Sequence, residues 1–466
     1  MTAIKFGTDG WRAIIAKDYT IDNVTRVAEA TAVWMGDRKM KKVVIGYDCR
    51  FGGQMFAERC ARVFGTHNIE VILSTDFVST PMISLAVVKT KADMGVVITA
   101  SHNPPSYNGY KLKSAYGGPT TPSETKEVEN LMPSKALNRL LSLKAIEEKG
   151  LLSYLDLEQM YFDHVVDHFD MKLIREAGAK LAFDAMYGAG QRILPRILPT
   201  AKLLHCDFNP SFKGQAPEPI ARNLKELAQL IKDDPNINVG LANDGDADRI
   251  GMFDEDGTFV DSHHLLLLLL YYMHEYKGMR GKVIYTFSVT DKMKQLANMF
   301  GLESQVTKIG FKYIAEIMIR EDVIVGGEES GGLAVKGHIP ERDGIWMGLL
   351  ILEFMAKTGK SIKELIQMVY EKVGAFNCDR DDLHITQEIK AQVIQNCKDN
   401  KYQQFGEYSV RKVETVDGFK FILTDDIWLM VRPSGTEPVL RIYCQAPDAA
   451  TVRKVLDIAN KALLDL

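Results

Sequence analysis

Short apolar segments that end in polar loops rich in glycine or proline recur along this chain, and this pattern restricts the fold more than any other feature. Helical patterns separate the apolar segments. Such alternation is typical of α/β proteins, in which parallel strands carry helices packed on the faces of the sheet. Three of these segments end in loops that carry hydroxyl or carboxylate side chains: Val96–Thr99, Asn238–Ala242 and Val323–Gly326.

We predict three consecutive related α/β domains with mixed, mainly parallel sheets, followed by a smaller C-terminal α+β domain, around a central cleft. The 466 residues exceed what one hydrophobic core organises. After Ala375, short alternating strands with flanking helices replace the earlier order. The expected domains are 1–150, 151–256, 257–372 and 373–466.

The same patterns predict individual elements. Expected strands are 42–47, 69–74, 96–99, 180–185, 202–206, 238–242, 282–287, 323–326, 409–415, 419–423, 427–432 and 440–444. Expected helices are 21–36, 155–169, 191–198, 223–232, 262–276, 291–299, 311–319, 343–356, 386–398 and 448–464.

Composition narrows the function classes. A net charge of −4 and a pI of about 6.2 give no global attraction to nucleic acid or to anionic membranes. The six cysteines show no metal-binding spacing, and we expect them to stay reduced in a cytoplasm. No signal-like segment is seen at the start. The apolar run Leu265–Met273 is too short to span a membrane and predicts a buried helix.

Ser101 is the first candidate for a chemically used residue. It follows the apolar strand directly, and Pro104 and Pro105 stiffen its loop and are expected to stop strand pairing there. A hydroxyl at the end of a parallel strand lies where ligands bind in open α/β sheets. The alternative is a turn built by asparagine and proline with no chemical role.

Asp244, Asp246 and Asp248 alternate around a glycine after the second of these strands. On an extended or turning backbone their carboxylates point to one side. Two carboxylates about 4 to 5 Å apart repel by roughly 3 to 4 kcal/mol at an effective dielectric of 20, so a cation is expected. Oxygen ligands at this density favour Mg²⁺. A solvated acidic turn is the alternative, and an EF-hand is excluded because Arg249 replaces its glycine.

Two further loops carry groups that suit a sugar phosphate. The glycine-lined loop 326–332 holds two acids and a serine, which can accept and donate hydrogen bonds to sugar hydroxyls; alternatively it is a surface hairpin. His338 lies shortly after it. The loop 432–438 offers an arginine, two hydroxyls and glycine-freed backbone N–H groups, an inventory that matches a phosphate. It lacks the spacing of a nucleotide P-loop, and an ordinary turn is its alternative.

Together these loops resemble a known family. TASHNPPSYNGYK (99–111), DGDADR (244–249), GEESGG (327–332) and RPSGTEP (432–438) are similar, in this order, to the phosphoserine, metal, sugar and phosphate loops of the α-D-phosphohexomutases. FGTDGWR (6–12) and GHIPERDG (337–344) extend the resemblance over essentially the whole chain.

The resemblance implies a role for each loop. Ser101 is expected to carry a phosphoryl group and, with Asp244, Asp246 and Asp248, to hold Mg²⁺. Proton transfer falls to Lys111 and His338, and we expect a lowered pKa for Lys111 if it serves as a base. The remaining implied site residues are Arg12 and His102 beside Ser101; Arg249, Lys308, Glu328, Ser330 and Arg342 for the substrate; and Arg432, Ser434, Gly435, Thr436 and Arg441 for the phosphate.

The resemblance also implies an activity. Phospho-Ser101 would donate to a hexose 1-phosphate, giving a hexose 1,6-bisphosphate that turns over and returns its other phosphate to the serine. Glucose is the expected sugar, because GEESGG and Ile309–Lys312 look closer to the phosphoglucomutase branch, and mannose is also expected to be accepted, because it differs from glucose only at C2. GEESGG also differs from the GEQSGH-like loop of the glucosamine-phosphate branch. The partners are small sugar phosphates, without nucleic acid or membrane, and the protein is expected to be a monomer or homodimer.

Other functions are open to test. A phosphoglucosamine mutase is one alternative, because RPSGTEP is shared with the glucosamine-phosphate branch of the family. A metal-dependent sugar phosphatase would use the same phosphoserine and release inorganic phosphate, and a non-catalytic sugar-phosphate sensor would keep only the pocket. A serine hydrolase that pairs Ser101 with His102 is disfavoured because neighbouring side chains diverge and no G-x-S-x-G elbow is present.

Overall fold

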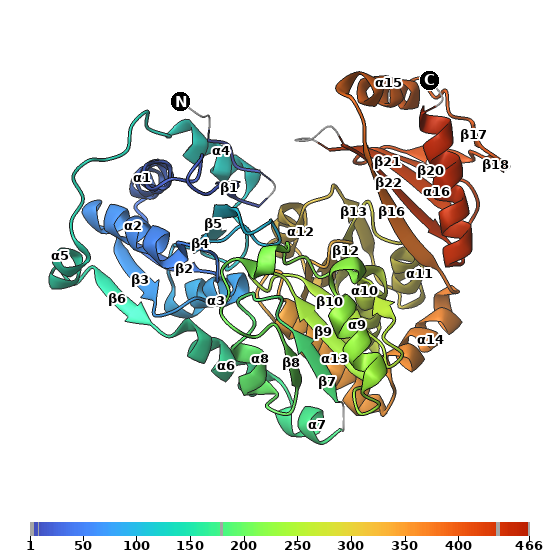
Figure 1. The fold of residues 1–466 in the computed structure, drawn as a ribbon, viewed down its shortest axis with the longest axis horizontal. Coiled ribbons are helices and arrows are strands. Elements are labelled where there is room, and N and C mark those ends of the chain that lie inside the picture. Colours follow the sequence, from blue (N-terminus) through green and yellow to red (C-terminus); the bar gives the residue numbers. More distant parts are fainter. Residues whose placement is uncertain (1–3, 8, 178–179, 435–438, 465–466) are drawn as a thin grey trace. The chain divides into compact units, whose positions relative to one another are not determined.

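The computed structural model describes residues 4–7, 9–177, 180–434 and 439–464. The chain divides into two compact units (Figure 1). The first comprises Met1–Lys282 and Gly310–Leu365, and the second comprises Val283–Ile309 and Ile366–Leu466.

The first sheet of the first unit has six strands in the order β1-β5-β4-β2-β3-β6. The inner strands β4, β2 and β3 and the edge strand β6 pair in parallel, whereas β5 runs antiparallel to both β1 and β4. The carboxyl end of β4 leads to Ser101. The strands are β1 (Trp11–Ile14), β2 (Lys42–Tyr47), β3 (Glu70–Ser74), β4 (Met94–Ile98), β5 (Tyr107–Ser114) and β6 (Leu152–Leu155).

Helices cover both faces of this sheet. Side chains alternate along β2, so Val43 and Ile45 pack into one core with helices α1 (Ile21–Asp37) and α2 (Gly53–Thr66). Gly46 faces the opposite side, where a Cβ would lie 2.7 Å from Ile83 of α3 (Thr80–Thr90). The close approach of α3 therefore requires glycine at this position.

A second sheet in this unit has the order β11-β10-β9-β7-β8, with β7 parallel to β8 and β9 and with β10 antiparallel to β9 and β11. Strand β9 delivers the aspartates 244–248. Strands β14 and β15 form an antiparallel hairpin. The strands are β7 (Leu181–Asp184), β8 (Lys202–Leu204), β9 (Val239–Asn243), β10 (Ile250–Phe253), β11 (Phe259–Val260), β14 (Val323–Gly327) and β15 (Leu333–Val335).

The remaining helices of this unit connect and flank these sheets (Figure 1). They are α4 (Pro122–Asn130), α5 (Leu143–Glu148), α6 (Leu157–His168), α7 (Met171–Glu176), α8 (Ile193–Ile197), η1 (Phe212–Gly214), η2 (Ala221–Asn223), α9 (Lys225–Asp233), α10 (Ser262–Tyr271), the π-helical turn η3 (Tyr272–Tyr276), α12 (Phe311–Met318) and α13 (Gly344–Thr358); α14 (Ile362–Val373) runs on into the second unit.

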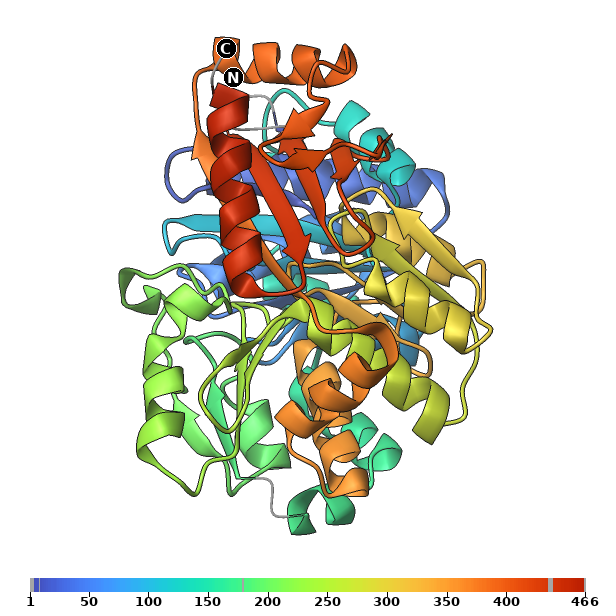
Figure 2. The same cartoon turned by 90° about the vertical axis from the view of Figure 1, so that its right-hand side faces the viewer.

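The second unit contains an antiparallel sheet of order β16-β22-β21-β20-β19, and α16 lies along this sheet (Figure 2). A core with Phe421, Leu429 and Leu456 joins helix and sheet. Its elements are β12 (Lys282–Thr286), α11 (Lys292–Met299), β13 (Ser304–Thr307), β16 (Asn377–His384), α15 (Gln387–Lys398), β17 (Gln404–Phe405), β18 (Tyr408–Ser409), β19 (Lys412–Glu414), β20 (Phe419–Ile422), β21 (Trp428–Pro433), β22 (Val439–Ala446) and α16 (Ala449–Leu464); β12 and β13 pair in parallel.

The mixed α/β class expected from sequence is confirmed, but some elements differ. The chain pairs again after Pro105, because Tyr107–Ser114 forms β5 against β4. Its buried lysines hide the usual strand pattern. The strand expected at 409–415 is two short strands, and the α-helix expected to reach residue 276 changes to a π-helical turn after Tyr271. The leucine run is a buried helix as predicted.

Candidate active site

Ser101 sits at the end of β4 in a left-handed backbone conformation, with φ of 53°. Its side chain is buried, and its Oγ donates a hydrogen bond of 2.7 Å to Oδ2 of Asp244. Gly245 permits this approach, since a Cβ there would lie 2.5 Å from the carbonyl oxygen of Ser101. The serine and the acidic loop, which were predicted separately, therefore form one site.

The three aspartates are buried together, and one carboxylate oxygen of each lies within 4.8 Å of the others. Oδ1 of Asp246 and Oδ1 of Asp248 are buried and accept no hydrogen bond from the residues that the structure describes. Orphaned carboxylate oxygens on a buried acidic cluster fit a divalent cation such as Mg²⁺. The residues predicted to hold the metal therefore have a suitable donor set.

Mutual repulsion shows in the aspartate pKa values. Burial, followed by the charges of Asp246 and Asp248, raises the pKa of Asp244 well above its ordinary value. Burial also raises the pKa of Asp246, but the ammonium of Lys111, the hydroxyl of Thr80 and the charge of Arg342 together outweigh it, and the net shift is downward. Positive side chains of the protein therefore stabilise part of the cluster; the sequence argument had expected a bound cation.

Lys111 supplies much of that charge. Its Nζ lies 2.7 Å from Oδ2 of Asp246, 2.9 Å from Oδ2 of Asp248 and 2.8 Å from Oδ2 of Asp9. Burial lowers the pKa of Lys111, but these three carboxylates more than reverse the effect, and the pKa is raised. The lowered pKa expected for this lysine is therefore wrong for the structure described, because carboxylates rather than cations surround it.

Asp9 is a site residue that the sequence reasoning missed. Besides Lys111, it pairs with Arg342 and lies 3.8 Å from Nζ of Lys113. Arg342 also contacts Oδ2 of Asp248 at 2.8 Å, so it bridges Asp9 and the metal loop. Glu341 in turn accepts a hydrogen bond of 2.6 Å from Lys113. The only sequence signal for Asp9 was its place in the FGTDGWR motif.

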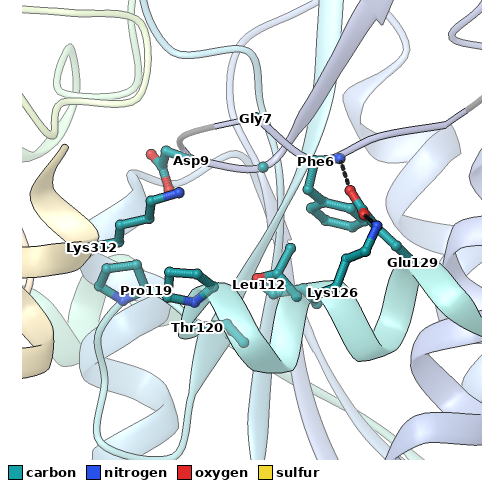
Figure 3. Close-up of a pocket in the computed structure, with 12 residues that line it drawn as sticks. Phe6, Gly7, Asp9, Leu112, Pro119, Thr120, Lys126, Glu129 and Lys312 are labelled. Carbon is teal, nitrogen blue, oxygen red and sulfur yellow. Dashed lines mark hydrogen bonds and ion pairs between the residues drawn. The ribbon is translucent and has the colours of Figure 1, made fainter. Parts of the chain in front are cut away.

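A cavity of about 170 Å³ borders this network, and Figure 3 shows Asp9 and Lys312 at one end of it and Phe6 at the other. Glu129 closes that end by accepting the N–H of Phe6 at 2.6 Å and by pairing with Lys126 at 2.9 Å. The cavity is lined by Phe6, Gly7, Asp9, Gly10, Leu112, Pro119, Thr120, Pro122, Thr125, Lys126, Glu129 and Lys312.

Arg12 and His102 both contact the Ser101 loop, and the divergence expected for the neighbouring side chains of Ser101 and His102 is wrong. Nη1 of Arg12 donates to Oδ1 of Asn103 at 2.6 Å, and Nδ1 of His102 lies 3.4 Å from Oγ of Ser101. Burial, followed by the charges of Arg249 and Arg12, lowers the pKa of His102 well below its ordinary value. The imidazole next to Ser101 is thus neutral near neutral pH.

Arg249 and the sugar loop lie in the same unit. The backbone N–H of Arg249 donates to Oδ1 of Asp244 at 3.1 Å. The carbonyl oxygen of Gly331 accepts the N–H of Ile250 at 3.2 Å, and this bond joins the sugar loop to the strand that follows the metal loop. Glu328 is buried near Arg342, whereas Ser330 is half-buried. Burial raises the pKa of Glu328 to about 7, although the Arg342 charge acts in the opposite direction.

The contacts of His338 that the structure describes are with residues of α6 and α13 and with Asp343. Its Nε2 lies 2.9 Å from Oδ2 of Asp343, its Nδ1 lies 3.4 Å from Nε2 of His164, and its ring stacks on Trp346 at 3.9 Å. Asp343 also accepts the hydroxyl of Tyr161 at 2.8 Å and caps α13. These contacts tie His338 to α6 and α13, and they are typical of a structural histidine.

The second unit carries the predicted phosphate loop. Nε of Arg432 lies 3.3 Å from Oδ2 of Asp417, and Asp417 also accepts the N–H of Ile309 at 2.9 Å, next to Lys308. Arg441, on β22, lies 3.7 Å from Asp382. Ser434 donates its N–H to Val439 O at 2.9 Å and its carbonyl accepts from Lys390. Gly435 and Thr436 lie outside the described residues.

All six cysteines are unpaired in the structure. In the part of the chain that the structure describes, no helix is long and apolar enough to cross a membrane.

Four family models match the chain in sequence order. They describe α/β/α domain I of phosphoglucomutase/phosphomannomutase at residues 3–139, domain II at 159–257, domain III at 261–373, and the C-terminal domain at 386–462. Fold and site thus define a four-domain α/β protein with a buried serine beside an acidic cluster that could hold a metal ion.

Whole-chain relatives agree with the domain models. A "phosphoglucomutase/phosphomannomutase" of Thermococcus kodakarensis is 31% identical over 98% of both chains, and a "probable phosphoglucosamine mutase" of Methanosphaera stadtmanae is 30% identical over 98% of both. A crystal structure from Thermus thermophilus, of a protein provisionally named phosphomannomutase, superposes with a TM-score of 0.88 at 33% identity, covering 99% of both chains. The chain belongs to the phosphoglucomutase/phosphomannomutase family. The names of these relatives refer to different sugars, so family membership alone does not identify the substrate as a glucose, mannose or glucosamine phosphate.

Proposed function

We propose that this protein interconverts hexose 1-phosphates and hexose 6-phosphates through a phosphoserine at Ser101 and a hexose 1,6-bisphosphate. The observation that carries the proposal is the 2.7 Å hydrogen bond from Ser101 Oγ to Asp244 inside a buried acidic cluster with orphaned oxygens. Family membership supports the mutase class.

In the proposed cycle, phospho-Ser101 transfers its phosphoryl group to the free 6-hydroxyl of a hexose 1-phosphate. The 6-hydroxyl gives its proton to a base in the site as its oxygen bonds to phosphorus, the bond between phosphorus and Ser101 Oγ breaks, Ser101 Oγ takes up a proton, and a 1,6-bisphosphate forms. After reorienting, the bisphosphate returns its 1-phosphate to Ser101 and leaves as the hexose 6-phosphate. Phosphoryl transfer of this kind depends on positioning and on charge stabilisation more than on covalent help from the protein.

The aspartates 244, 246 and 248, with Ser101, would hold Mg²⁺, which supplies neutralisation of the charge on the transferred phosphoryl group. Arg12, Lys111 and Arg342 add positive charge to the same loops. His102, whose Nδ1 lies 3.4 Å from Ser101 Oγ, is the residue best placed to move a proton at that oxygen.

Substrate recognition is proposed from the family loops. Glu328 and Ser330 would hold hydroxyls common to both orientations of the sugar, with Arg249, Lys308 and Arg342 as further substrate contacts. A buried carboxylate next to a glycine-lined loop suits this task. The phosphate that does not react would be held by Arg432, Ser434, Gly435, Thr436 and Arg441.

Turnover of hexose phosphates tests the proposal. Purified protein with Mg²⁺ and a trace of glucose 1,6-bisphosphate should interconvert glucose 1- and 6-phosphate, while Ser101→Ala should not. Steady release of inorganic phosphate in place of isomerised sugar would instead indicate a phosphatase. Binding without turnover, unchanged in Ser101→Ala, would indicate a sensor.

We propose glucose as the preferred sugar, with mannose also accepted, from the sequence of the GEESGG loop. Phosphoglucosamine is a second candidate, because relatives with 28–30% identity are named phosphoglucosamine mutases. A comparison of kcat/KM for glucose, mannose and glucosamine 1-phosphates separates the two. Preference for glucosamine 1-phosphate would overturn the glucose assignment and leave the mutase proposal standing.

A further inference from the structure

Arg50 lies buried against the loop that carries Ser101, and no step of the proposed cycle uses it. Its guanidinium donates to backbone carbonyls of residues 101–107, a segment in which Pro104 and Pro105 contribute no N–H groups. One side chain thereby binds four backbone carbonyls around the serine, of which Pro104 O also accepts the N–H of Tyr107. The contacts are Nη1 to Pro104 O (2.9 Å) and Tyr107 O (3.0 Å), and Nη2 to Asn103 O (2.6 Å) and Ser101 O.

Asp48 and Thr99 complete this arrangement on the other side of the serine. Oδ2 of Asp48 lies 3.3 Å from Nε of Arg50 and accepts the hydroxyl of Thr99 at 2.5 Å. Thr99 Oγ1 in turn accepts the N–H of Ser101 at 2.9 Å. A continuous chain of contacts therefore holds both the N–H and the C=O of Ser101. Phe212 covers the guanidinium, with its ring centroid 5.0 Å from Cζ.

The held conformation is one that serine rarely adopts. A non-glycine residue at φ of 53° is strained and persists only when its surroundings determine it. In this conformation Ser101 Oγ meets Asp244. If the loop relaxed, the hydroxyl would lose that alignment, and in-line phosphoryl transfer tolerates little displacement.

We propose that Arg50 is a positioning residue which, with Asp48 and Thr99, holds Ser101 in the left-handed conformation that aims its Oγ at the acidic cluster. The inference rests on the proposed mutase function for its catalytic consequence. Lysine cannot replace arginine here, because one ammonium cannot reach four carbonyl oxygens in a fixed fork geometry.

Arg50→Lys tests the proposal, with Arg26→Lys as the matched control. Arg26 also donates to a loop carbonyl, that of Pro133 at 2.8 Å, but away from Ser101. We expect Arg50→Lys to lower kcat by about a hundredfold and to change the KM for hexose phosphate by less than about threefold. Hydrogen exchange should rise in the peptide 99–107. The control should match the wild type in both measurements.

A second pair keeps the proposal falsifiable if Arg50→Lys does not fold. Thr99→Val, which removes the acceptor for the Ser101 N–H, should show the same loss of kcat, and Thr99→Ser should restore most of it. Values of kcat within about twofold of wild type and unchanged exchange in the variant that folds would overturn the proposal. If the wild type itself shows no mutase turnover, the proposed function fails, whereas hydrogen exchange still tests whether Arg50 holds the loop.

Discussion

The hydroxyl of Ser101 and the carboxylate of Asp244 meet at 2.7 Å, although 143 positions separate them in the sequence. Burial and two neighbouring aspartates raise the pKa of Asp244, so this side of the serine carries crowded negative charge. A phosphate on Ser101 would add about two further negative charges. The pair therefore lies at the proposed phosphoryl site, where a phosphate would need a cation beside it.

Mg²⁺ should stabilise the protein through the orphaned oxygens of Asp246 and Asp248. At a free concentration of a hundred times Kd we expect about 2.7 kcal/mol of added stability, measured by thermal or urea unfolding. Asp246→Asn should lose most of this gain. Asp256→Asn, which alters an exposed ion pair with Lys363, should retain it, and equal Mg²⁺ responses in the two variants would contradict the assigned metal site.

Lys111→Gln should destabilise the metal-free protein. The substitution leaves the buried Asp246 and Asp248 and the half-buried Asp9 without the ammonium that they share, with Arg342 remaining beside Asp9 and Asp248; loss of one partner of a buried pair costs about 3 to 5 kcal/mol. Lys126→Gln breaks only a largely exposed pair with Glu129 and should cost less than about 1 kcal/mol in the same urea titration. A loss for Lys111→Gln no larger than that control would show that the ammonium is not needed to balance the cluster.

Glu328 should make stability depend on pH between about 4.5 and 7. Burial raises the pKa of this carboxyl from 4.5 to about 7, so the folded state binds the proton more tightly than the unfolded state. The contribution of Glu328 to the free energy of unfolding is fully present below pH 4.5 and is lost as the pH rises through 7.

Glu328→Gln removes that dependence. The variant should gain stability relative to wild type as the pH rises from 5 to 8, by up to about 3 kcal/mol, measured by urea unfolding at each pH. Glu316→Gln, on α12 at a partly exposed pair with Arg320, should show no such trend. A stability difference that does not vary with pH would refute the raised pKa.

His338→Gln should affect stability more than chemistry. The imidazole bonds to Asp343 and stacks on Trp346, and we expect its replacement to cost about 1 to 2 kcal/mol. If the contacts of His338 are structural, kcat measured on folded protein stays within about threefold of wild type. A fall of about a hundredfold or more, with normal folding, would restore the general acid–base role first expected from the motif.

Local patterns in the sequence were enough to find the serine and the aspartates that the structure brings together. An apolar strand followed by alternating aspartates places Asp244, Asp246 and Asp248 together whatever the rest of the fold does, because their spacing is set by the backbone. Ser101 was predicted from a similar local pattern, a polar loop that directly follows an apolar strand. The α/β class followed from the alternation of the elements.

The partners of these groups could not be predicted in this way. Arg50 and Asp9 reach Ser101 and Lys111 only because β-sheet pairing brings distant segments together. The charge state of Lys111 depends on three carboxylates from two other segments, so a motif alone gave the wrong direction for its pKa. Buried lysines in β5 likewise hid a strand, because strand patterns assume apolar inward faces.

Mass spectrometry of the peptide that contains Ser101 tests most directly whether this serine carries the transferred phosphoryl group. After incubation of the protein with glucose 1,6-bisphosphate and Mg²⁺, we expect one phosphoryl group on Ser101. A chase with excess hexose 1-phosphate should move it to the sugar at the rate of turnover. Phosphate on another residue, or full mutase turnover in Ser101→Ala, would contradict the assignment of Ser101 as the phosphoryl carrier.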